Sequence, residues 1–473
     1  MAKEYDLVIL GGGIGGYTAA IRATQLGFKT AIVENHKLGG TCLHYGCIPT
    51  KTWLQSAGIY RMVRNSGEFG IITEDPVINF SAVRKRTASV INRLHRGLEL
   101  LIKKRKIDVY HGYGRILGPS IFSPLAGTIS IETDDPQKTE MLIPKFLLIA
   151  TGSERKNIPG LEVDGEYIFS SMEMLELNQL PRSIMIIGGG VIGTEWASLL
   201  ADFNVNVSII EQAERILPFE DEEISAEISS LFAKKGIQIY TNAKVLPDTL
   251  EKGNGVSVQI EKEGITETVE AEKMLISTGR TGKISGIGLE NTNIETDGNF
   301  IKVNPYYQTK ETYIYAIGDC IGGLQLAHVA AKEGITAVEH MAGKDPQPLD
   351  YTMVPRCIYS HPEIAAIGLT ETEAKKKYNH VKISKIPFQA VGKAVVEDET
   401  NGFIKMITDA ETEDLLGVHI IGSRASELIS EASLAKFLDA TADEIAYTIH
   451  PHPTLSEIFP EAGLQIDGKA IHI

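Results

Sequence analysis

The hydrophobic pattern of the first part of the chain predicts a strand, a helix and a second strand. Residues 5–10 form a short apolar run, and residues 30–33 form another. Between them, residues 17–27 are rich in alanine and isoleucine at helical spacing. Short apolar runs bounded by glycine are typical of buried strands, and longer periodic stretches are typical of helices. A glycine turn joins the first strand to the helix, so we expect a strand–turn–helix–strand unit.

The same pattern recurs in the middle of the chain. Residues 183–187 and 207–210 are apolar, and a glycine turn and a helical stretch separate them. Each unit runs 23 residues from its first turn glycine to the acidic residue that ends its second strand, and the two units match at an offset of 177 residues. We interpret this match as an internal duplication.

Further patterns lie outside the duplicated units. Residues 81–106 have apolar positions at helical spacing and many charges on the other face, which predicts a long helix packed along one side. The basic run 103–106 at its end is expected to be solvated rather than to form a binding patch. Past about residue 346, alternating and apolar runs predict several strands, and helical stretches follow at 426–438 and 442–449.

Each glycine turn fits the pattern G-x-G-x-x-G. The glycines let the backbone approach a pyrophosphate, the helix N-terminus offers N–H groups, and the acid after the second strand binds ribose hydroxyls. Two complete units predict two dinucleotides in one chain. The residues expected to contact them are Gly11, Gly13, Gly16 and Glu34 in the first unit, and Gly188, Gly190, Gly193 and Glu211 in the second.

These units set the expected architecture of the 473-residue chain, which is too long for one ordinary core. We expect an α/β protein with two Rossmann-like dinucleotide-binding domains and a C-terminal α+β dimerisation domain. The predicted divisions are 1–150 for the first nucleotide-binding domain, 151–278 for the second, 279–345 for a central segment that completes the first nucleotide-binding region, and 346–473 for the interface domain.

Composition narrows the class of protein. A hydrophobic content of 43% and a charged content of 23% are ordinary for globular proteins. No apolar run approaches the ~18 residues that span a bilayer, and the N-terminal residues lack the order of a signal peptide. Four cysteines and no export signal favour a reducing cytoplasm. A net charge of −15 argues against a nucleic-acid partner, and it is compatible with docking a basic protein.

Two of the four cysteines, Cys42 and Cys47, lie within six residues in the stretch GGTCLHYGCIPTK. A disulfide that closes so small a loop removes little unfolded-state entropy, so stability is a poor reason for the pair. A redox-active dithiol is the better interpretation. The pair follows the first unit by only eight residues, and a flavin is the dinucleotide that exchanges electrons with thiols. We therefore expect FAD on the first unit and the nicotinamide on the second.

The nicotinamide is expected to be NAD rather than NADP. Glu211 can accept the 2′-hydroxyl of NAD, and it would repel the 2′-phosphate of NADP. Gln212 and Ala213 follow it, and the nearest basic residue is Arg215.

Three strand ends after the glycine turns carry small or acidic residues: Thr151-Gly152, Thr278-Gly279 and Gly318-Asp319. Strand ends of this kind face the ligand crevice of a parallel sheet. Asp319 is therefore a candidate for holding the ribityl chain of the flavin, or it is a turn aspartate.

A second chemical cluster lies near the C-terminus, in IHPHPTLSEIF. His450 and His452 are spaced for alternate exposure in an extended, proline-flanked segment. Thr454 and Glu457 fit the T-x-x-E pattern of a capping box. Glu457 has two interpretations: it caps a short helix, or it orients a histidine that deprotonates thiols. No metal ligand set is predicted.

With these motifs, the chain resembles the flavoprotein disulfide reductases, the class I pyridine nucleotide-disulfide oxidoreductases, over essentially its whole length. GGTCLHYGCIPTK resembles the redox-disulfide segment of the family, GGGIGG and AIGD its FAD contacts, GGGVIGTEWA its NAD site, and HPHPTLSE its catalytic base. Among the branches of the family, the motifs are similar to those of the branch that oxidises dihydrolipoamide.

The resemblance implies specific roles. Cys42 would be the thiol that meets the substrate, and Cys47 the thiol that contacts the flavin. Lys51 would lie by the flavin and pair with Glu195 of the NAD unit. His452, held by Glu457, would be the base and would act on the disulfide of the other subunit of a homodimer. Further expected cofactor contacts are Thr41, Lys51, Thr151, Gly152, Asp319 and Ala327 for FAD, and Glu195 and Gly279 for NAD.

The resemblance also implies partners: the lipoyl domain of an acyltransferase core, a second copy of the chain, and a 2-oxo acid dehydrogenase complex such as a branched-chain or pyruvate complex. A glutathione reductase would need basic residues near Glu211, and a mercuric reductase would need a C-terminal cysteine pair, and both are missing. A role as an assembly subunit that docks on a multienzyme core stays open. Cys320 and Cys357 match no redox role and are expected to be buried fillers.

Overall fold

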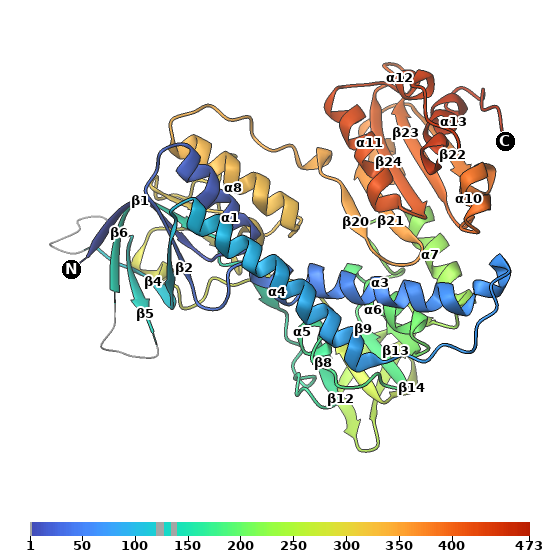
Figure 1. Cartoon of the computed structure of the whole chain (residues 1–473), viewed down its shortest axis with the longest axis horizontal. Coiled ribbons are helices and arrows are strands. Elements are labelled where there is room, and N and C mark those ends of the chain that lie inside the picture. The colour runs from blue at the N-terminus through green and yellow to red at the C-terminus, as the bar shows by residue number, and fades with distance from the viewer. Residues whose placement is uncertain (1, 120–126, 134–139) are drawn as a thin grey trace. The chain divides into compact units, whose positions relative to one another are not determined.

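The computed structural model of the protein describes residues 2–119, 127–133 and 140–473 (Figure 1). The chain forms two compact units, and each of them is built from three segments. The first unit contains residues 1–52, 81–156 and 279–349, and the second contains residues 53–80, 157–278 and 350–473. Two of the five boundaries between the segments fall within helices, α3 (Cys47–Arg64) and α4 (Phe80–Lys104).

The first unit is organised around a seven-stranded sheet. Four of its strand pairings are parallel, and two more strands add an antiparallel edge. The order is β3-β2-β1-β6-β5-β4, with β19 beside β6. The strands are β1 (Lys3–Leu10), β2 (Thr30–Glu34), β3 (Asp108–His111), β4 (Tyr113–Leu117), β5 (Thr128–Glu132), β6 (Glu140–Ile149) and β19 (Ile314–Ala316).

The side chains of β1 alternate between two hydrophobic cores, one on each face of the sheet. Leu7 and Ile9 are buried with α1 (Ile14–Gln25) and α8 (Ala327–Met341) on one face of the sheet, and Val8 and Leu10 are buried on the other. The predicted strand–turn–helix–strand unit is present, with β1 and β2 parallel. The helix begins earlier than predicted because the last glycines of the turn already belong to its first turn.

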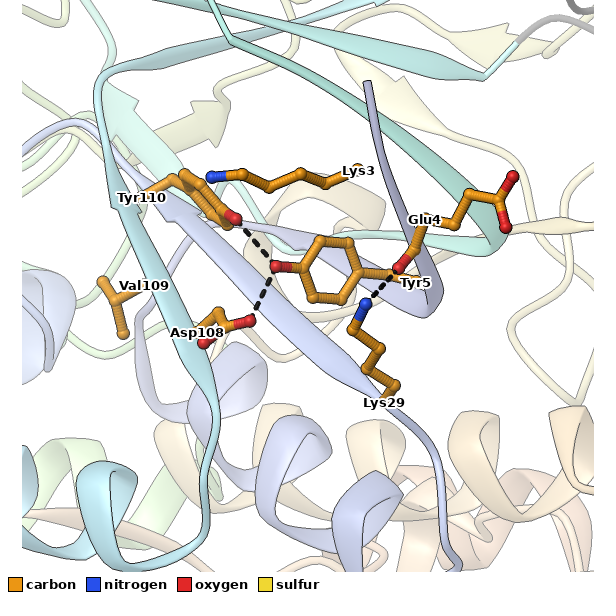
Figure 2. Close-up of a pocket in the computed structure, with 7 residues that line it drawn as sticks. All are labelled: Lys3, Glu4, Tyr5, Lys29, Asp108, Val109 and Tyr110. Atoms are coloured by element: carbon orange, nitrogen blue, oxygen red, sulfur yellow. Dashed lines mark hydrogen bonds between the residues drawn. The ribbon is translucent and has the colours of Figure 1, made fainter. Parts of the chain in front are cut away.

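A surface pocket of about 510 Å³ lies at the end of this sheet where β1 and β3 begin (Figure 2). Tyr5 hydroxyl hydrogen-bonds Asp108 at 2.6 Å and the hydroxyl of Tyr110 at 2.7 Å, and Lys29 donates to the carbonyl of Glu4 at 2.8 Å. Ligands of parallel sheets bind at the opposite edge, beyond the carboxyl ends of the strands. The pocket is therefore distinct from the predicted dinucleotide site.

The remaining elements of the first unit are short and surround the redox segment and the sheet end. The redox segment itself forms α2 (Gly40–His44) and the start of α3. A small sheet pairs β7 with β16, and another pairs β17 with β18. The bounds are β7 (Ser153–Arg155), β16 (Arg280–Gly282), η3 (Leu289–Asn291), β17 (Thr296–Asp297), β18 (Phe300–Ile301) and η4 (Gly318–Ile321).

The second unit repeats the nucleotide-binding arrangement in a five-stranded parallel sheet of order β11-β10-β9-β15-β8. A three-stranded antiparallel sheet adds to it. The elements are β8 (Ile168–Ser170), α5 (Ser171–Met174), β9 (Ser183–Ile187), α6 (Val191–Asp202), β10 (Asn206–Ile210), α7 (Glu222–Lys234), β11 (Gln238–Tyr240), β12 (Lys244–Lys252), β13 (Val256–Lys262), β14 (Ile265–Ala271) and β15 (Lys273–Ile276).

The C-terminal part of the second unit is the predicted α+β domain. Its antiparallel sheet has the order β20-β21-β24-β23-β22, and β24 is buried along its whole length. The elements are η5 (Tyr351–Met353), β20 (Arg356–Ile358), β21 (Glu363–Gly368), α9 (Glu371–Lys377), β22 (Val381–Pro387), η6 (Phe388–Ala390), α10 (Gly392–Val396), β23 (Phe403–Asp409), β24 (Leu415–Gly422), α11 (Ala425–Phe437), α12 (Ala442–Tyr447), η7 (Leu455–Glu457) and α13 (Ile458–Gln465); η1 (Ser66–Phe69) completes the unit.

These observations confirm the expected fold class: two nucleotide-binding α/β arrangements and a C-terminal α+β domain. Among the helices that the structure describes, none combines the length and apolar character that a membrane span requires.

A buried ion cluster joins the parallel sheet of the second unit to its C-terminal domain. Lys405, in the middle of β23, is 1% exposed, and its ammonium lies 3.0 Å from Asp221 and 2.8 Å from Glu223 at the start of α7. It also pairs with Glu371 of α9. Burial works to lower the pKa of Lys405, but the three carboxylates raise it above its usual range. The cluster therefore stays charged at neutral pH.

We expect Lys405→Met to lower the free energy of unfolding of the second unit by about 3–5 kcal/mol at pH 7, because the carboxylates are left without their buried cation. In the wild type, burial raises the pKa of Asp221 but His419 and Lys405 lower it below its usual value, and the pKa values of Glu223 and Glu371 are lowered too. The stability that these carboxylates contribute is present above their unfolded pKa and is lost as pH falls, so the difference between wild type and variant should shrink towards pH 4.

Denaturant unfolding followed across this pH range measures the difference. Lys385→Met is the matched control, because Lys385 pairs with Glu223 at 2.7 Å while it is 44% exposed, and it should cost less than about 1 kcal/mol. Equal losses in the two variants would contradict a dominant role for the buried cation.

Candidate active site

The first glycine turn is packed too closely for any side chain at two of its positions. Gly11 has φ +104°, and a Cβ there would lie 2.3 Å from the carbonyl oxygen of Ala150. A Cβ at Gly16 would lie 1.9 Å from the carbonyl oxygen of Gly11. The turn therefore exposes backbone N–H groups at the start of α1, as a pyrophosphate site requires.

The carboxylate of Glu34, at the end of β2, holds this turn. Its Oε2 accepts a hydrogen bond from the N–H of Gly12 at 2.7 Å, and its Oε1 accepts one from the N–H of His36 at 2.8 Å. Each carboxylate oxygen has a further lone pair, so both remain able to accept from ribose hydroxyls.

The second glycine turn repeats this construction. A Cβ at Gly193 would lie 2.0 Å from the carbonyl oxygen of Gly188. Glu211 Oε2 accepts from the N–H of Gly189 at 2.6 Å, and Oε1 accepts from the N–H of Ala213 at 2.7 Å. The duplication inferred from the sequence therefore extends to the hydrogen bonds of the two acidic residues.

Arg215, the nearest basic residue to Glu211 in the sequence, is engaged elsewhere. Its guanidinium lies 2.9 Å from the carboxylate of Glu214 and donates to the carbonyl oxygen of Pro218 at 3.1 Å. This arrangement leaves Glu211 as the charged group next to the turn, which suits a 2′-hydroxyl rather than a 2′-phosphate.

The redox segment begins directly against the first glycine turn. The N–H of Gly39 donates to the carbonyl oxygen of Gly12 at 2.8 Å. Gly40 has φ +58°, and a Cβ there would lie 2.7 Å from the Cα of Gly13. The cysteine pair is therefore fixed to the turn that is predicted to hold the flavin, and Thr41 lies at the same junction in α2.

Cys42 and Cys47 are both half-buried thiols. A side-chain hydrogen bond with Cys47 and burial raise the pKa of Cys42, and the nearby charge of Lys51 opposes them. Cys47 lies at the first position of α3, where the helix dipole favours negative charge. The two sulfurs thus occupy different electrostatic positions, with the proton held preferentially on Cys42.

The sequence analysis missed an imidazole pair behind the redox loop. His44 Nε2 hydrogen-bonds the carbonyl oxygen of Leu38 at 2.8 Å, and His95 Nδ1 of α4 hydrogen-bonds the same oxygen at 3.1 Å. The two rings meet edge to face with centroids 5.1 Å apart. Burial lowers the pKa of His44, which therefore stays neutral at neutral pH. No spacing rule links a residue of the loop to one 51 positions away, so this contact has no local signal in the sequence.

Asp319 lies on η4 next to two residues that the sequence analysis did not single out. Ser153 hydroxyl donates to the Asp319 carboxylate, and Arg280 Nε donates to the Ser153 hydroxyl at 2.7 Å. Burial lowers the pKa of Arg280, and the Asp319 carboxylate opposes this effect. Both new residues directly follow predicted strand-end positions, Gly152 and Gly279, and this adjacency was the available signal.

Ala327 is the first residue of α8. Ala327 and Asp319 both belong to the first unit, so the two predicted flavin contacts of this region lie in the same unit as the first glycine turn. Glu333 of α8 accepts from the N–H of Gly318 at 2.7 Å, which ties the helix to the turn that carries Asp319.

In the second unit, Glu195 of α6 is 5% exposed, and its Oε1 accepts from the N–H of Tyr359 at 3.1 Å. Its neighbour Trp196 is buried and meets the ring of Trp53 edge to face at 5.6 Å. This contact explains a large aromatic residue beside Glu195. Lys51, the predicted partner of Glu195, belongs to the first unit, so their pairing stays a prediction.

The two histidines near the C-terminus differ in exposure. His450 has a side chain that is 6% exposed, and its Nε2 lies 2.6 Å from Glu431 of α11. His452 has a side chain that is 77% exposed, and its Nδ1 hydrogen-bonds Glu457 Oε1 at 2.9 Å. A carboxylate only accepts, so Nδ1 carries the proton and Nε2 keeps its lone pair towards solvent. His452 is thus the histidine with the geometry of a base.

Glu457 makes the contacts of both interpretations that the sequence left as alternatives. Its Oε2 accepts from the N–H of Thr454 at 2.9 Å and completes a capping box, while its Oε1 holds His452. Burial raises the pKa of Glu457, but the hydrogen bonds from Thr454 and His452 lower it overall. The cap fixes the carboxylate, and the carboxylate fixes the imidazole.

The other two cysteines lie on separate elements, Cys320 on η4 of the first unit and Cys357 on β20 of the second. Cys320 is fully buried and donates to the carbonyl oxygen of Ile317 at 3.1 Å, and burial raises the pKa of its thiol to about 12. Cys357 is half-buried in β20. A thiol with the raised pKa of Cys320 is unreactive at neutral pH.

The predicted site residues therefore form two groups. The first unit brings together the first glycine turn, Glu34, the cysteine pair with Lys51, and the strand ends around Asp319. The second unit holds the second glycine turn, Glu195, Glu211 and the His452–Glu457 pair.

Comparison with known proteins agrees with this geometry. The model of the pyridine nucleotide-disulphide oxidoreductase family matches residues 5–334, and the model of its dimerisation domain matches residues 354–463. The chain is 60% identical, over the whole of both chains, to a dihydrolipoyl dehydrogenase of Bacillus subtilis. It is 38% identical to the mitochondrial dihydrolipoyl dehydrogenase of Pisum sativum, over 100% of this chain and 93% of the relative.

Solved structures give the same picture. LpdA of Mycobacterium tuberculosis is similar with a TM-score of 0.90 and 27% identity, over 98% of this chain and 100% of that one. The flavoprotein disulfide reductase RclA of Escherichia coli, which is induced by HOCl, is similar with a TM-score of 0.84 and 25% identity, over 97% and 99% of the two chains.

The duplicated turns allow the two dinucleotide sites to be separated. We expect Gly16→Ala to abolish flavin retention, because the new methyl group would meet the carbonyl oxygen of Gly11 and open the turn. Gly193→Ala should keep the flavin and lose reduction of NAD⁺. The ratio of flavin to protein absorbance and the formation of NADH measure the two effects. Gly67→Ala, where a Cβ would meet no atom within 4 Å, is the control. A Gly16→Ala protein with a full complement of flavin would contradict this assignment.

Glu457→Gln tests the pairing with His452 without removing the cap, because an amide oxygen still accepts from Thr454. We expect turnover of a dithiol substrate to fall by about 10²-fold, the scale of general-base catalysis. The free energy of unfolding should change by less than about 1 kcal/mol. Glu444→Gln alters the same position of another capping box, on Thr441, and should leave turnover unchanged. Equal turnover in the two variants would exclude the orienting role.

Proposed function

We propose the function of this chain on the premise that it belongs to the pyridine nucleotide-disulphide oxidoreductase family. Within the family it is a dihydrolipoyl dehydrogenase, which oxidises dihydrolipoamide to lipoamide with FAD and NAD⁺. The observation that carries this conclusion is the 60% identity over the full length of a protein with that name. Two matched glycine turns and a dithiol fixed to one of them supply its physical basis.

The residues of the first unit fit FAD. The tight turn at Gly11 and Gly16 leaves room for a pyrophosphate but for no side chain, and Glu34 is placed for ribose hydroxyls. Thr151 and Gly152 follow the end of β6, and Thr41 and Lys51 belong to the redox segment. Asp319 accepts a hydrogen bond from Ser153, and the N-terminus of α8 at Ala327 favours negative charge. Bound FAD supplies the two-electron path from the dithiol to NAD⁺.

The second unit fits NAD. Gly188, Gly190 and Gly193 form its turn, and Gly279, the first residue of the next segment of the first unit, follows the end of β15 in the sequence. Arg215, the nearest basic residue to Glu211 in the sequence, pairs with Glu214 instead of offering a cation to a 2′-phosphate. Glu195, beside the turn on α6, is our proposed partner for Lys51.

The chemistry of the chain's own residues is thiol–disulfide exchange. A thiolate of dihydrolipoamide attacks the sulfur of Cys42, the Cys42–Cys47 bond breaks, and Cys47 leaves as a thiolate. The second substrate thiol then attacks the substrate sulfur of the mixed disulfide, lipoamide is released, and the reduced pair retains two electrons. The raised pKa of Cys42 and the position of Cys47 at a helix N-terminus favour this division of roles.

His452 accepts the substrate proton at Nε2, because Glu457 keeps the other ring nitrogen protonated. In this proposal His452 acts on the disulfide of the second subunit, as the family resemblance implies. The match to a dimerisation domain supports a homodimer. We also propose that the chain has the four functional domains predicted from its sequence, with bounds 1–150, 151–278, 279–345 and 346–473.

The natural substrate is proposed to be the lipoyl domain of an acyltransferase core, and the enzyme to be a component of a 2-oxo acid dehydrogenase complex of the branched-chain or pyruvate type. The names of its relatives support dihydrolipoamide as the dithiol substrate. Membership of a complex is a further step of the proposal. A cytoplasmic location suits a dithiol that must be reduced and reoxidised in each turnover.

Cys47→Ser tests the division of roles between the sulfurs. We expect the variant to retain FAD and to lose turnover of dihydrolipoamide with NAD⁺ by at least about 10³-fold, because no disulfide can form. NADH absorbance measures turnover, and the wild type should form one NADH for each dithiol oxidised. Cys357→Ser is the control with an equal loss of one sulfur, and it should keep full activity. Full activity in Cys47→Ser would eliminate the scheme.

A further inference from the structure

The long helix α4 carries a concentrated positive charge in an acidic protein. Residues 84–106 contain nine basic residues against one acidic residue, a net charge of +8 in a chain whose net charge is −15. The remainder of the chain therefore carries −23. Such separation of charge creates a local positive potential that the net charge of the protein conceals.

The exposed cations lie on one face of the helix. At about 100° per residue, Lys85, Arg96 and Lys103 fall within about 20° of one another around the axis, and Arg93 and Lys104 lie about 90° further round. All five side chains belong to exposed residues. We call these five residues the basic face of α4. The buried side of the helix, with Thr87 and Ile102, lies opposite.

An exposed leucine lies within the basic face. Leu100 falls between the two rows of cations at the same angular spacing, and it is 69% exposed. Interfaces with proteins place apolar anchors among polar rims, whereas contacts with phosphates need only the cations. The combination of exposed cations and an exposed leucine between them therefore fits a protein surface better than a nucleic acid.

The inner side of the same helix contacts the redox segment. His95 reaches the carbonyl oxygen of Leu38 and the ring of His44, between the two cysteines. A partner that docks on the outer side of α4 is therefore held on the element that packs against the disulfide loop.

We propose that the basic face of α4, with Leu100 between its two rows of cations, docks an acidic protein domain that carries the dithiol substrate on a flexible side chain. The face extends about 28 Å from Lys85 to Lys104, at 1.5 Å per residue. Electrostatic complementarity of this kind raises the rate of productive encounter. From the sequence alone, residues 103–106 were expected to be solvated rather than to form a binding patch. The exposed Leu100 and the contact of α4 with the redox loop lead us to propose a binding role for Lys103 and Lys104 instead.

The proposal rests on the proposed function, and the test separates the two. The same dithiol is presented as free dihydrolipoamide and as a reduced lipoylated domain of net negative charge. In Arg93→Glu/Arg96→Glu, kcat/KM for the domain should fall by about tenfold or more, through KM, while kcat/KM for free dihydrolipoamide changes by less than about twofold. Added salt should lower kcat/KM of the wild type for the domain and have less effect on the variant.

Two further variants complete the test. Lys376→Glu/Lys377→Glu makes the same change of charge on exposed lysines of α9 and should behave as the wild type on both substrates. Leu100→Ser should weaken turnover of the domain without changing the salt dependence. Activity of the wild type on neither substrate would refute the proposed function.

Three outcomes would overturn the docking proposal while free dihydrolipoamide is still oxidised. The first is an equal effect of Arg93→Glu/Arg96→Glu on both substrates, and the second is no effect on either. The third is binding of a short DNA duplex to the wild type that the double variant loses, with unchanged kinetics for the lipoylated domain, because this result would assign the face to nucleic acid.

Discussion

The close approach of two backbone segments, at Gly13 and Gly40, is the constraint on which the first unit depends. A side chain at Gly40 would collide with Gly13, and the hydrogen bond from Gly39 to Gly12 fixes the distance between the segments. The loop with the two cysteines therefore starts where the dinucleotide turn ends. The junction therefore places the dithiol beside the turn that we propose to hold the flavin.

Much of the fold follows from local patterns in the sequence. The two strand–turn–helix–strand units have glycines and acids at fixed spacing, and short-range chemistry of this kind specifies both the turn and its ligand. The capping box of Thr454 and Glu457 was equally predictable from the sequence, because the two residues lie three positions apart. Lys405, by contrast, sits in an apolar strand, and nothing next to it in the sequence reveals that Asp221, 184 positions earlier, supplies its counter-charge. The His44–His95 contact escaped prediction for the same reason. Long-range polar contacts depend on tertiary packing, and a single sequence carries no local signal for them.

Glu457 shows that a structural and a catalytic interpretation of one residue need not exclude each other. A carboxylate has two oxygens, and here each serves a different partner: Thr454 N–H on one side and His452 on the other. The helix cap limits the motion of the carboxylate, so the imidazole inherits a fixed orientation. The fixed tautomer of His452 is thus a consequence of how a short helix begins.

Glu34 and Glu211 also bear on the thermodynamics of cofactor binding. Glycine-rich segments have the largest backbone entropy in an unfolded chain, and a ligand that had to order them would bind weakly. Each acid already clamps its turn through two backbone N–H groups before any dinucleotide arrives. The ordering cost is therefore met during folding, and the two sites are preorganised for their ligands. Glycine-rich segments thereby become hydrogen-bonded turns at the two proposed dinucleotide sites.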